Sequence, residues 1–230
     1  MSIFTSVSIL FLAMLIQAFL QLTPGLFSIF YHSALAKTTR KKADDLALYY
    51  ILGVEVSLAI IFIAIFFLMA LIFTNQSFIT GIFPWLMAGI FGAESVAVFF
   101  YYFRKKSTAL FLPRKAANSL ALRAKNLKNR SDAFVLGFIA ALPELIFTIP
   151  LFMIVSFEML KISDFPSYFI VFLYILFAIS PLFLIRTFFR GDLNLADIQK
   201  LRTKNQPFYR LILTIGFLLL ALLMINSGLI

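Results

Sequence analysis

Long apolar stretches separated by short polar and basic segments dominate this chain. A membrane-spanning helix needs about 20 mostly apolar residues. Six stretches meet that requirement, approximately residues 3–30, 47–73, 83–103, 133–157, 168–185 and 211–225. The pattern therefore predicts an all-α polytopic membrane protein with six transmembrane helices.

The composition agrees with this prediction and narrows the chemistry. Of the 230 residues, 62% are hydrophobic, whereas soluble domains are about 45–50% apolar. The chain has no cysteine, which excludes disulfides and thiolate metal sites, and its single histidine, His32, excludes a zinc site with several histidine ligands. The segment after Met1 has no basic region and no small-residue cleavage site, so we expect a retained first helix and not a signal peptide.

The basic residues are distributed unevenly among the connecting segments. Nineteen of the 20 lie after the first, third and fifth spans, at residues 37–42, 104–130 and 186–210, and only Lys161 lies in an alternate loop. The positive-inside rule makes those three segments cytoplasmic. The net charge of +10 thus indicates an anionic inner leaflet, not nucleic acid, as the partner. We expect a multi-pass protein of the cell membrane with both termini extracytoplasmic.

This topology gives the two halves of the chain opposite orientations. The predicted units are residues 1–103, a basic cytoplasmic linker at 104–132, and residues 133–230. Each half contains one short proline element: Leu-Thr-Pro-Gly-Leu at 22–26 and Ala-Leu-Pro-Glu-Leu at 141–145. Together these features predict two inverted three-helix repeats, a common plan among transporters.

The linker contains a helical pattern of its own. Five apolar residues between 115 and 128 follow a three-and-four spacing: Ala117, Leu120, Ala121, Ala124 and Leu127. Two interpretations remain open. The segment is either a basic amphipathic helix on the inner leaflet or a solvated linker whose charges fix the topology.

Three carboxylates lie inside predicted spans, namely Glu55, Glu94 and Glu144, and no lysine or arginine lies deep in any span. Ionisable groups at such depth are functional candidates. Each is either a neutral acid that donates a hydrogen bond to a neighbouring helix or a carboxylate that binds a cation. Glu144 is the strongest candidate because it follows Pro143, which removes a backbone hydrogen bond and leaves a carbonyl without its donor. Pro150 is a second candidate break in the same span.

We therefore predict a substrate site formed by the two proline elements. Its residues are Glu144, Pro143, Pro24, Gly25, Thr23 and Thr148, with ion or proton coupling through Glu55 or Glu94. The hydroxyl groups have an alternative role, which is to satisfy the backbone at the helix breaks. For Gly53, beside Glu55, and for Gly89 with Gly92, we favour close helix packing. No cofactor is expected, and a bound metal is left open.

Several short motifs resemble the lysine-exporter (LysE-type) superfamily of amino-acid and cation exporters. The chain has Leu22-Thr23-Pro24-Gly25, then Arg40-Lys41-Lys42-Ala43, then Leu52-Gly53, in the order of that superfamily's first two helices. In the second half, Phe134-Val135-Leu136-Gly137 precedes Leu142-Pro143-Glu144, where the family reads Asn-Pro-Lys. The resemblance implies six spans of 3 + 3 type and an export function.

The chain departs from the family at the site itself. Leu26 replaces the family's second proline, Leu142 replaces its asparagine and Glu144 replaces its lysine. A lysine-to-glutamate change reverses the charge beside the cavity, so a site that suited a carboxylate now suits a cation. Export of ordinary amino acids is thereby disfavoured relative to a cationic solute or ion.

The sequence favours a secondary transporter that exports a small cationic solute or ion. It is not expected to be an enzyme, since it lacks a His-Glu-x-x-His motif and a Ser-His pairing, and it has no phosphate-binding loop for ATP. Two alternatives are a non-transporting membrane subunit (an immunity, sensor or assembly partner) and, less favoured, a membrane-embedded enzyme that uses paired acids. A homodimer suits a bundle of this size.

Overall fold

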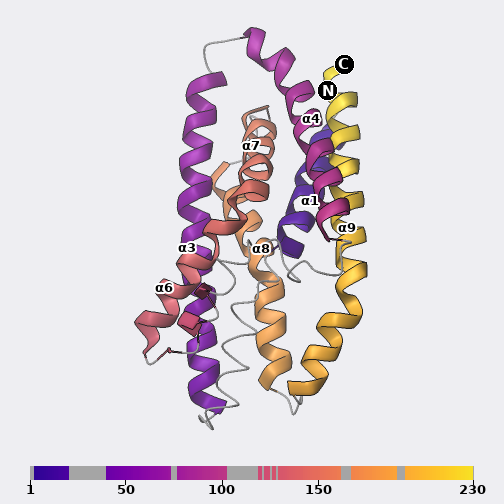
Figure 1. The fold of residues 1–230 in the computed structure, drawn as a ribbon. Helices are drawn as coiled ribbons and strands as arrows, with labels where there is room; N and C mark the ends of the chain where they lie inside the picture. Colours follow the sequence, from indigo (N-terminus) through magenta and orange to yellow (C-terminus); the bar gives the residue numbers. More distant parts are fainter. Residues whose placement is uncertain are drawn as a thin grey trace.

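The structure is a computed structural model that describes residues 3–20, 40–73, 77–102, 119–120, 122–124, 126–127, 129–161, 167–190 and 195–229. These residues form helices and short turns (Figure 1). The elements are α1 (Ile3–Leu20), α3 (Arg40–Phe73), α4 (Ser77–Tyr102), α6 (Arg130–Ala140), the 3-10 turn η1 (Leu142–Glu144), α7 (Leu145–Lys161), α8 (Ser167–Arg190) and α9 (Leu195–Leu229). The all-α prediction is confirmed for this part of the chain.

The helices have the length and composition of membrane spans. Over the described residues, α3, α4, α8 and α9 are each long and apolar enough to cross a bilayer, and α6 with α7 makes a fifth span if the bent pair is one span. The chain is thus a multi-pass helical membrane protein. The apolar part of α1 is shorter, and residues 21–30 of the predicted first span lie outside the described residues. α7 continues through Pro150, so the predicted second break at that residue is wrong.

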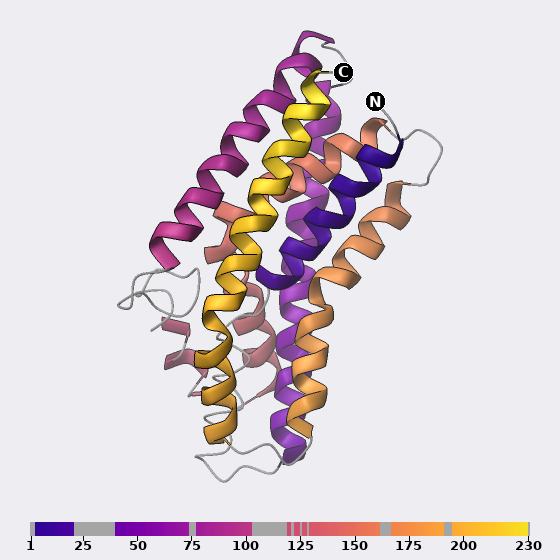
Figure 2. The same ribbon diagram turned by 90° about the vertical axis from the view of Figure 1, so that its right-hand side faces the viewer.

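The helices alternate in direction along the chain. In Figures 1 and 2, α1, α4 and α8 run away from the end of the molecule where both termini lie, and α3, α6 with α7, and α9 run toward it. The helix ends that border the basic segments, at Arg40, Arg130 and Arg190, lie at the opposite end. The two termini are therefore on one side, as the charge pattern predicts. We call the end with the termini the outer end and the end with the basic segments the inner end.

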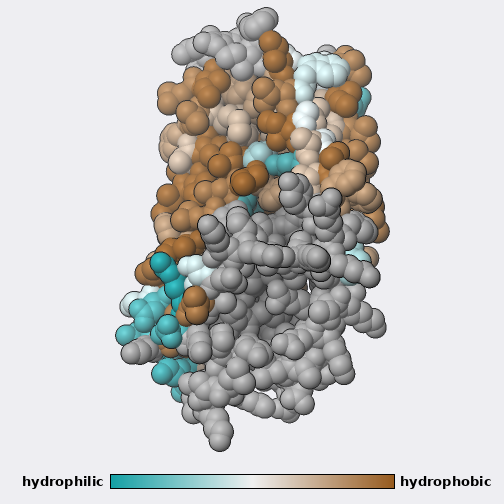
Figure 3. Space-filling view, in the orientation of Figure 1, coloured by the Kyte–Doolittle hydropathy of each residue, from teal (hydrophilic) through white to brown (hydrophobic). Residues whose placement is uncertain are grey.

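The outward surface of the upper part of the bundle is apolar. Figure 3 shows a mostly hydrophobic face there, with hydrophilic atoms gathered at the start of α6. Large side chains such as Phe67, Leu71 and Ile146 are more than 60% exposed. A soluble protein would bury them, so these residues face the lipid.

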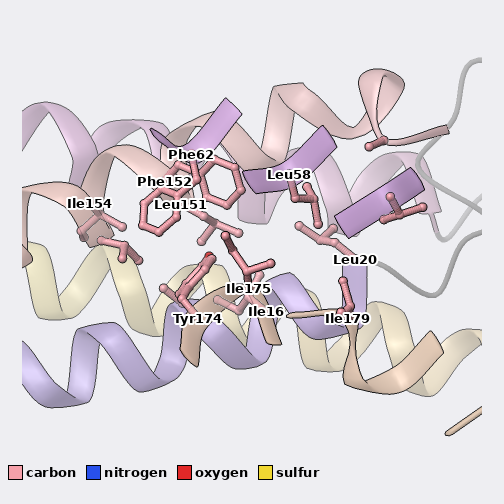
Figure 4. Packing of buried hydrophobic residues seen from close by; sticks show 14 of the residues in the cluster. Ile16, Leu20, Leu58, Phe62, Leu151, Phe152, Ile154, Tyr174, Ile175 and Ile179 are labelled. Carbon is pink, nitrogen blue, oxygen red and sulfur yellow. The ribbon is translucent and has the colours of Figure 1, made fainter. Parts of the chain in front are cut away.

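The core forms where helices of the two halves meet. α4 packs along α9, α3 packs along α6, and α1 lies against α7, α8 and α9. Figure 4 shows apolar side chains from α1, α3, α7 and α8 converging, among them Ile16, Leu58, Leu151 and Ile175. All four are at most 8% exposed.

α3 and α6 cross at two glycines. A Cβ atom at Gly53 would overlap the carbonyl oxygen of Phe134, and a Cβ atom at Gly137 would overlap the carbonyl oxygen of Tyr50. The two backbones are therefore in direct contact, which only glycine permits. The packing role predicted for Gly53 is confirmed. The same prediction is wrong for Gly89 and Gly92, because a Cβ atom at either position meets no atom within 4 Å.

The described part of the linker is helical at residues 119–120 and 122–124. Leu120 and Ala124 are buried in the main apolar cluster, and Leu122 and Arg123 are exposed. The predicted apolar face exists over these residues. It packs on the protein's own core, an arrangement that neither predicted alternative contained.

Candidate functional site

The predicted break at Pro143 is present. Proline has no N–H to donate to the carbonyl four residues earlier, so α6 ends at Ala140 and the chain passes through η1. The backbone N–H of Glu144 donates to the carbonyl oxygen of Ala141 at 3.3 Å, in the tighter 3-10 pattern. α6 and α7 meet there at 73°. The side chain of Pro143 is outside the described part of the structure.

Two of the predicted site residues are buried directly after this break. Glu144 is 2% exposed, and Thr148 is fully buried. Residues four apart on a helix lie on the same face, so the carboxyl and the hydroxyl group face the same part of the interior. The break thus brings an acidic and a neutral polar group into the bundle beside α1.

Gln17 of α1 lies opposite Thr148. Its Nε2 donates a hydrogen bond to Thr148 Oγ1 at 3.3 Å, and both side chains are fully buried. The other amide atom, Gln17 Oε1, is buried without a hydrogen-bond partner among the described residues. An acceptor in that position is available to a donor or cation that enters the site.

Ser57 of α3 is a further buried polar residue near the break. It lies one turn after Gly53 on the side of α3 that contacts α6, and its Oγ has no hydrogen-bond partner in the described part of the chain. The sequence analysis missed it because a serine in a span is an ordinary packing residue. Its spacing of four residues from Gly53 was the available signal.

Three aromatic rings pack together on the outer side of Thr148. Phe152, one turn after Thr148, lies 4.8 Å from the ring of Phe62 and 5.8 Å from the ring of Tyr174, measured between centroids. Phe62 and Tyr174 are 5.2 Å apart, which completes a triangle of rings from α7, α3 and α8 (Figure 4). All three are fully buried. This aromatic cluster lies one turn beyond Thr148 in the direction of the outer end.

Glu94 lies in a different polar cluster, between α4 and α9. It is 7% exposed, and its Oε2 is buried without a hydrogen-bond partner among the described residues. The next residue, Ser95, donates to the backbone carbonyl of Thr214 at 2.9 Å.

Phe217 packs against one aromatic ring near each of the two buried acids. The ring of Phe217 lies 6.2 Å from Phe91, three residues before Glu94, and 6.0 Å from Phe147, three residues after Glu144. An apolar ring therefore stands where α4, α7 and α9 approach one another. The two acids occupy neighbouring regions of one core.

Of the predicted residues not yet described, only Glu55 lies in the part of the chain that the structure describes. Glu55 is half-buried on α3. Thr23, Pro24 and Gly25 lie outside the described residues, so the predicted meeting of the two proline elements is untested. In the described ranges, no three His, Asp, Glu or Cys side chains are grouped closely enough to hold a metal ion.

An open cavity of about 480 Å³ lies at the inner end, between the starts of α3 and α6. Its lining includes Lys42, Asp45, Asn129 and Arg130. Arg130 bonds to Asp45 at 2.7 Å and lies over the ring of Tyr49. The cavity lies at the inner end of the molecule, away from the helix break.

Comparison with protein-family models, with characterised proteins and with solved structures found no match to this chain. The resemblance to the lysine-exporter superfamily remains a prediction from the motifs.

Proposed function

We propose that the protein is a secondary transporter of LysE-like type that exports a small cationic solute or ion. The observation that carries this proposal is the buried carboxyl group of Glu144 at a helix break, one turn from Thr148 and opposite Gln17 of the other half. Discontinuous helices that meet at a polar centre are typical of secondary transporters. The outward direction of transport rests on the family resemblance alone.

The chemistry of the site favours a cation. An isolated carboxylate away from water is costly, so it requires either a proton or a positive partner. The side chains of Thr148 and Gln17 supply neutral polar groups on the same side of α7 as Glu144, and the amide oxygen of Gln17 accepts no hydrogen bond among the described residues. A proton and a cationic substrate would compete for Glu144, and such competition couples the movement of one to the movement of the other.

The helix arrangement supports alternating access. Residues 1–103 and 133–230 supply helices of opposite direction, as two inverted repeats would. The aromatic cluster of Phe62, Phe152 and Tyr174 acts as the outer barrier in this conformation, and it must separate to release substrate outward.

Of the two proposed coupling residues, Glu94 is the better supported. Its Oε2 is buried without a partner among the described residues, whereas Glu55 is only half-buried. We propose that Glu94 binds the coupling proton or ion. Glu55 remains a candidate coupling residue that water reaches from the inner side.

A thermal-shift screen of the purified protein against inorganic cations, basic amino acids and organic amines tests substrate class and site together. A ligand at 100 times its Kd stabilises the folded state by about 2.7 kcal/mol. We expect a cation that stabilises the wild-type protein and not Glu144→Gln. Stabilisation of both proteins to the same extent would show that the ligand does not bind at Glu144. Absence of transport in sealed vesicles would favour the non-transporting subunit.

A further inference from the structure

The outer end of α7 holds an ammonium group between an acid and an aromatic ring. Lys161 Nζ lies 3.1 Å from Glu158 Oε1 and 3.8 Å from the centroid of the Phe157 ring. Both partners belong to the preceding turn of the same helix. A carboxylate beside an aromatic face is a recognised way to bind organic ammonium ions.

The two sides of this arrangement differ in burial. Glu158 is fully buried and Phe157 is 2% exposed, whereas the Lys161 side chain is 33% exposed. The Phe157 ring is held by Phe73 and Phe83, whose centroids lie 5.0 Å and 4.5 Å from it. The acid and the ring therefore form a fixed receptor, and the lysine reaches it from the outer surface.

The buried acid has further binding capacity. Glu158 Oε2 is buried and accepts no hydrogen bond in the described part of the structure. A buried carboxylate that loses its positive partner is strongly destabilised. Lysine, in contrast, is a flexible chain with a compact charge that moves easily into water. If Lys161 moves away, Glu158 has to be neutralised by a proton or by another cation.

We propose that Phe157 and Glu158 form an outer binding site for a primary ammonium group, and that Lys161 is its exchangeable occupant in this conformation. The site is separate from the central one, because Glu158 of α7 follows Glu144 of η1 by 14 residues, or about 21 Å along a helix. Its use as an exit site for a cationic solute rests on the proposed function. The binding of an ammonium ion at this site does not depend on the proposed function.

The experiment removes the tethered amine and supplies a free one. Lys161→Ala lacks a three-carbon ammonium chain, so propylammonium is the matched probe. Thermal unfolding of the purified protein is measured with propylammonium chloride, and with sodium chloride and propanol as controls for charge and for the apolar tail. We expect a saturable rise in the unfolding temperature of Lys161→Ala with propylammonium only, and no such rise in the wild-type protein.

A second variant tests the receptor. In Glu158→Gln/Lys161→Ala we expect the apparent Kd for propylammonium to weaken at least tenfold. An equal response of this double variant, an equal response of the wild type, or no response of Lys161→Ala would overturn the proposal. If Lys161→Ala fails to fold, propylammonium present during purification should restore it. Failure of that rescue, with Glu158→Gln/Lys161→Ala folding normally, also contradicts the proposal.

The outcome is independent of the central site. Glu144→Gln/Lys161→Ala should bind propylammonium as Lys161→Ala does, whether or not Glu144 carries transport. Loss of transport with retained outer binding, and the reverse, are therefore distinguishable results.

Discussion

The side-chain amide of Gln17 donates a 3.3 Å hydrogen bond to the hydroxyl of Thr148, and the two residues are 131 positions apart in the chain. The bond joins α1 of the first half to α7 of the second, one turn from Glu144. Both side chains are fully buried. This contact connects the halves of the molecule at the site proposed for the substrate.

The energetic value of this contact is measurable by a double-mutant cycle. Thr148→Val leaves the buried amide of Gln17 without its acceptor, at a cost of about 1–3 kcal/mol. Gln17→Leu/Thr148→Val should recover part of that loss because neither polar group remains. We expect a coupling energy of about 0.6 kcal/mol and at most about 1.7 kcal/mol, the average and the maximum measured for hydrogen bonds between membrane helices. Denaturation in detergent gives the four free energies, and a coupling of zero would show that the pair does not interact.

The crossing of α3 and α6 predicts which glycines tolerate alanine. Gly53→Ala and Gly137→Ala place a methyl group on backbone atoms that cannot rotate away, so each should cost about 1–3 kcal/mol or more. Gly89→Ala is the matched control, since a Cβ there meets no atom within 4 Å. We expect the control to unfold at or slightly above the wild-type temperature. Equal effects at the three positions would contradict the crossing.

Two adjacent aspartates of α3 bind arginines of two different helices. We expect the two ion pairs to contribute unequally to the free energy of unfolding. Arg186 of α8 forms two hydrogen bonds with Asp44, at 2.7 and 2.9 Å, and both side chains are less than 20% exposed. The Asp45–Arg130 pair is 37% and 61% exposed. Asp44→Asn should therefore cost about 1–3 kcal/mol, or about 2–4 °C in unfolding temperature for each kcal/mol. Asp45→Asn should have a smaller effect, and the reverse order would contradict this assignment.

The proposed orientation is testable by labelling, since the chain contains no cysteine that would react in the background. A membrane-impermeant maleimide should label Leu229→Cys in intact cells, and it should label Lys42→Cys only after lysis. Both positions are exposed in the structure. Labelling of Lys42→Cys in intact cells would invert the topology and place the basic segments outside.

The sequence predicted the architecture because a bilayer restricts what a chain can do. Runs such as residues 47–73 have to be helices. The distribution of 19 basic residues predicts their orientation. The break at Pro143 followed from the missing N–H of proline, and the packing role of Gly53 followed from its small size.

Several features of the site were not predictable in this way. Nothing in the local sequence of α1 identifies Thr148 as the partner of Gln17, because the pairing depends on how two distant helices pack. Glu158 lies one residue beyond the predicted span 133–157, and its complete burial depends on how the helices pack. The direction of the 73° bend likewise depends on the contact of α6 with α3, which no local pattern encodes.

The most direct test of the central claim is transport by the Glu144→Gln variant in proteoliposomes, using the cation that the thermal-shift screen identifies. Glutamine preserves the size of the side chain and one acceptor oxygen, replaces the other oxygen with a donating NH2 group, and removes the negative charge. Thr148→Ser, which retains the hydroxyl group, is the matched control and should transport at a rate close to wild type. We predict that Glu144→Gln folds and reconstitutes like the wild type and that its transport falls at least tenfold. Undiminished transport by Glu144→Gln would contradict the assignment of the site.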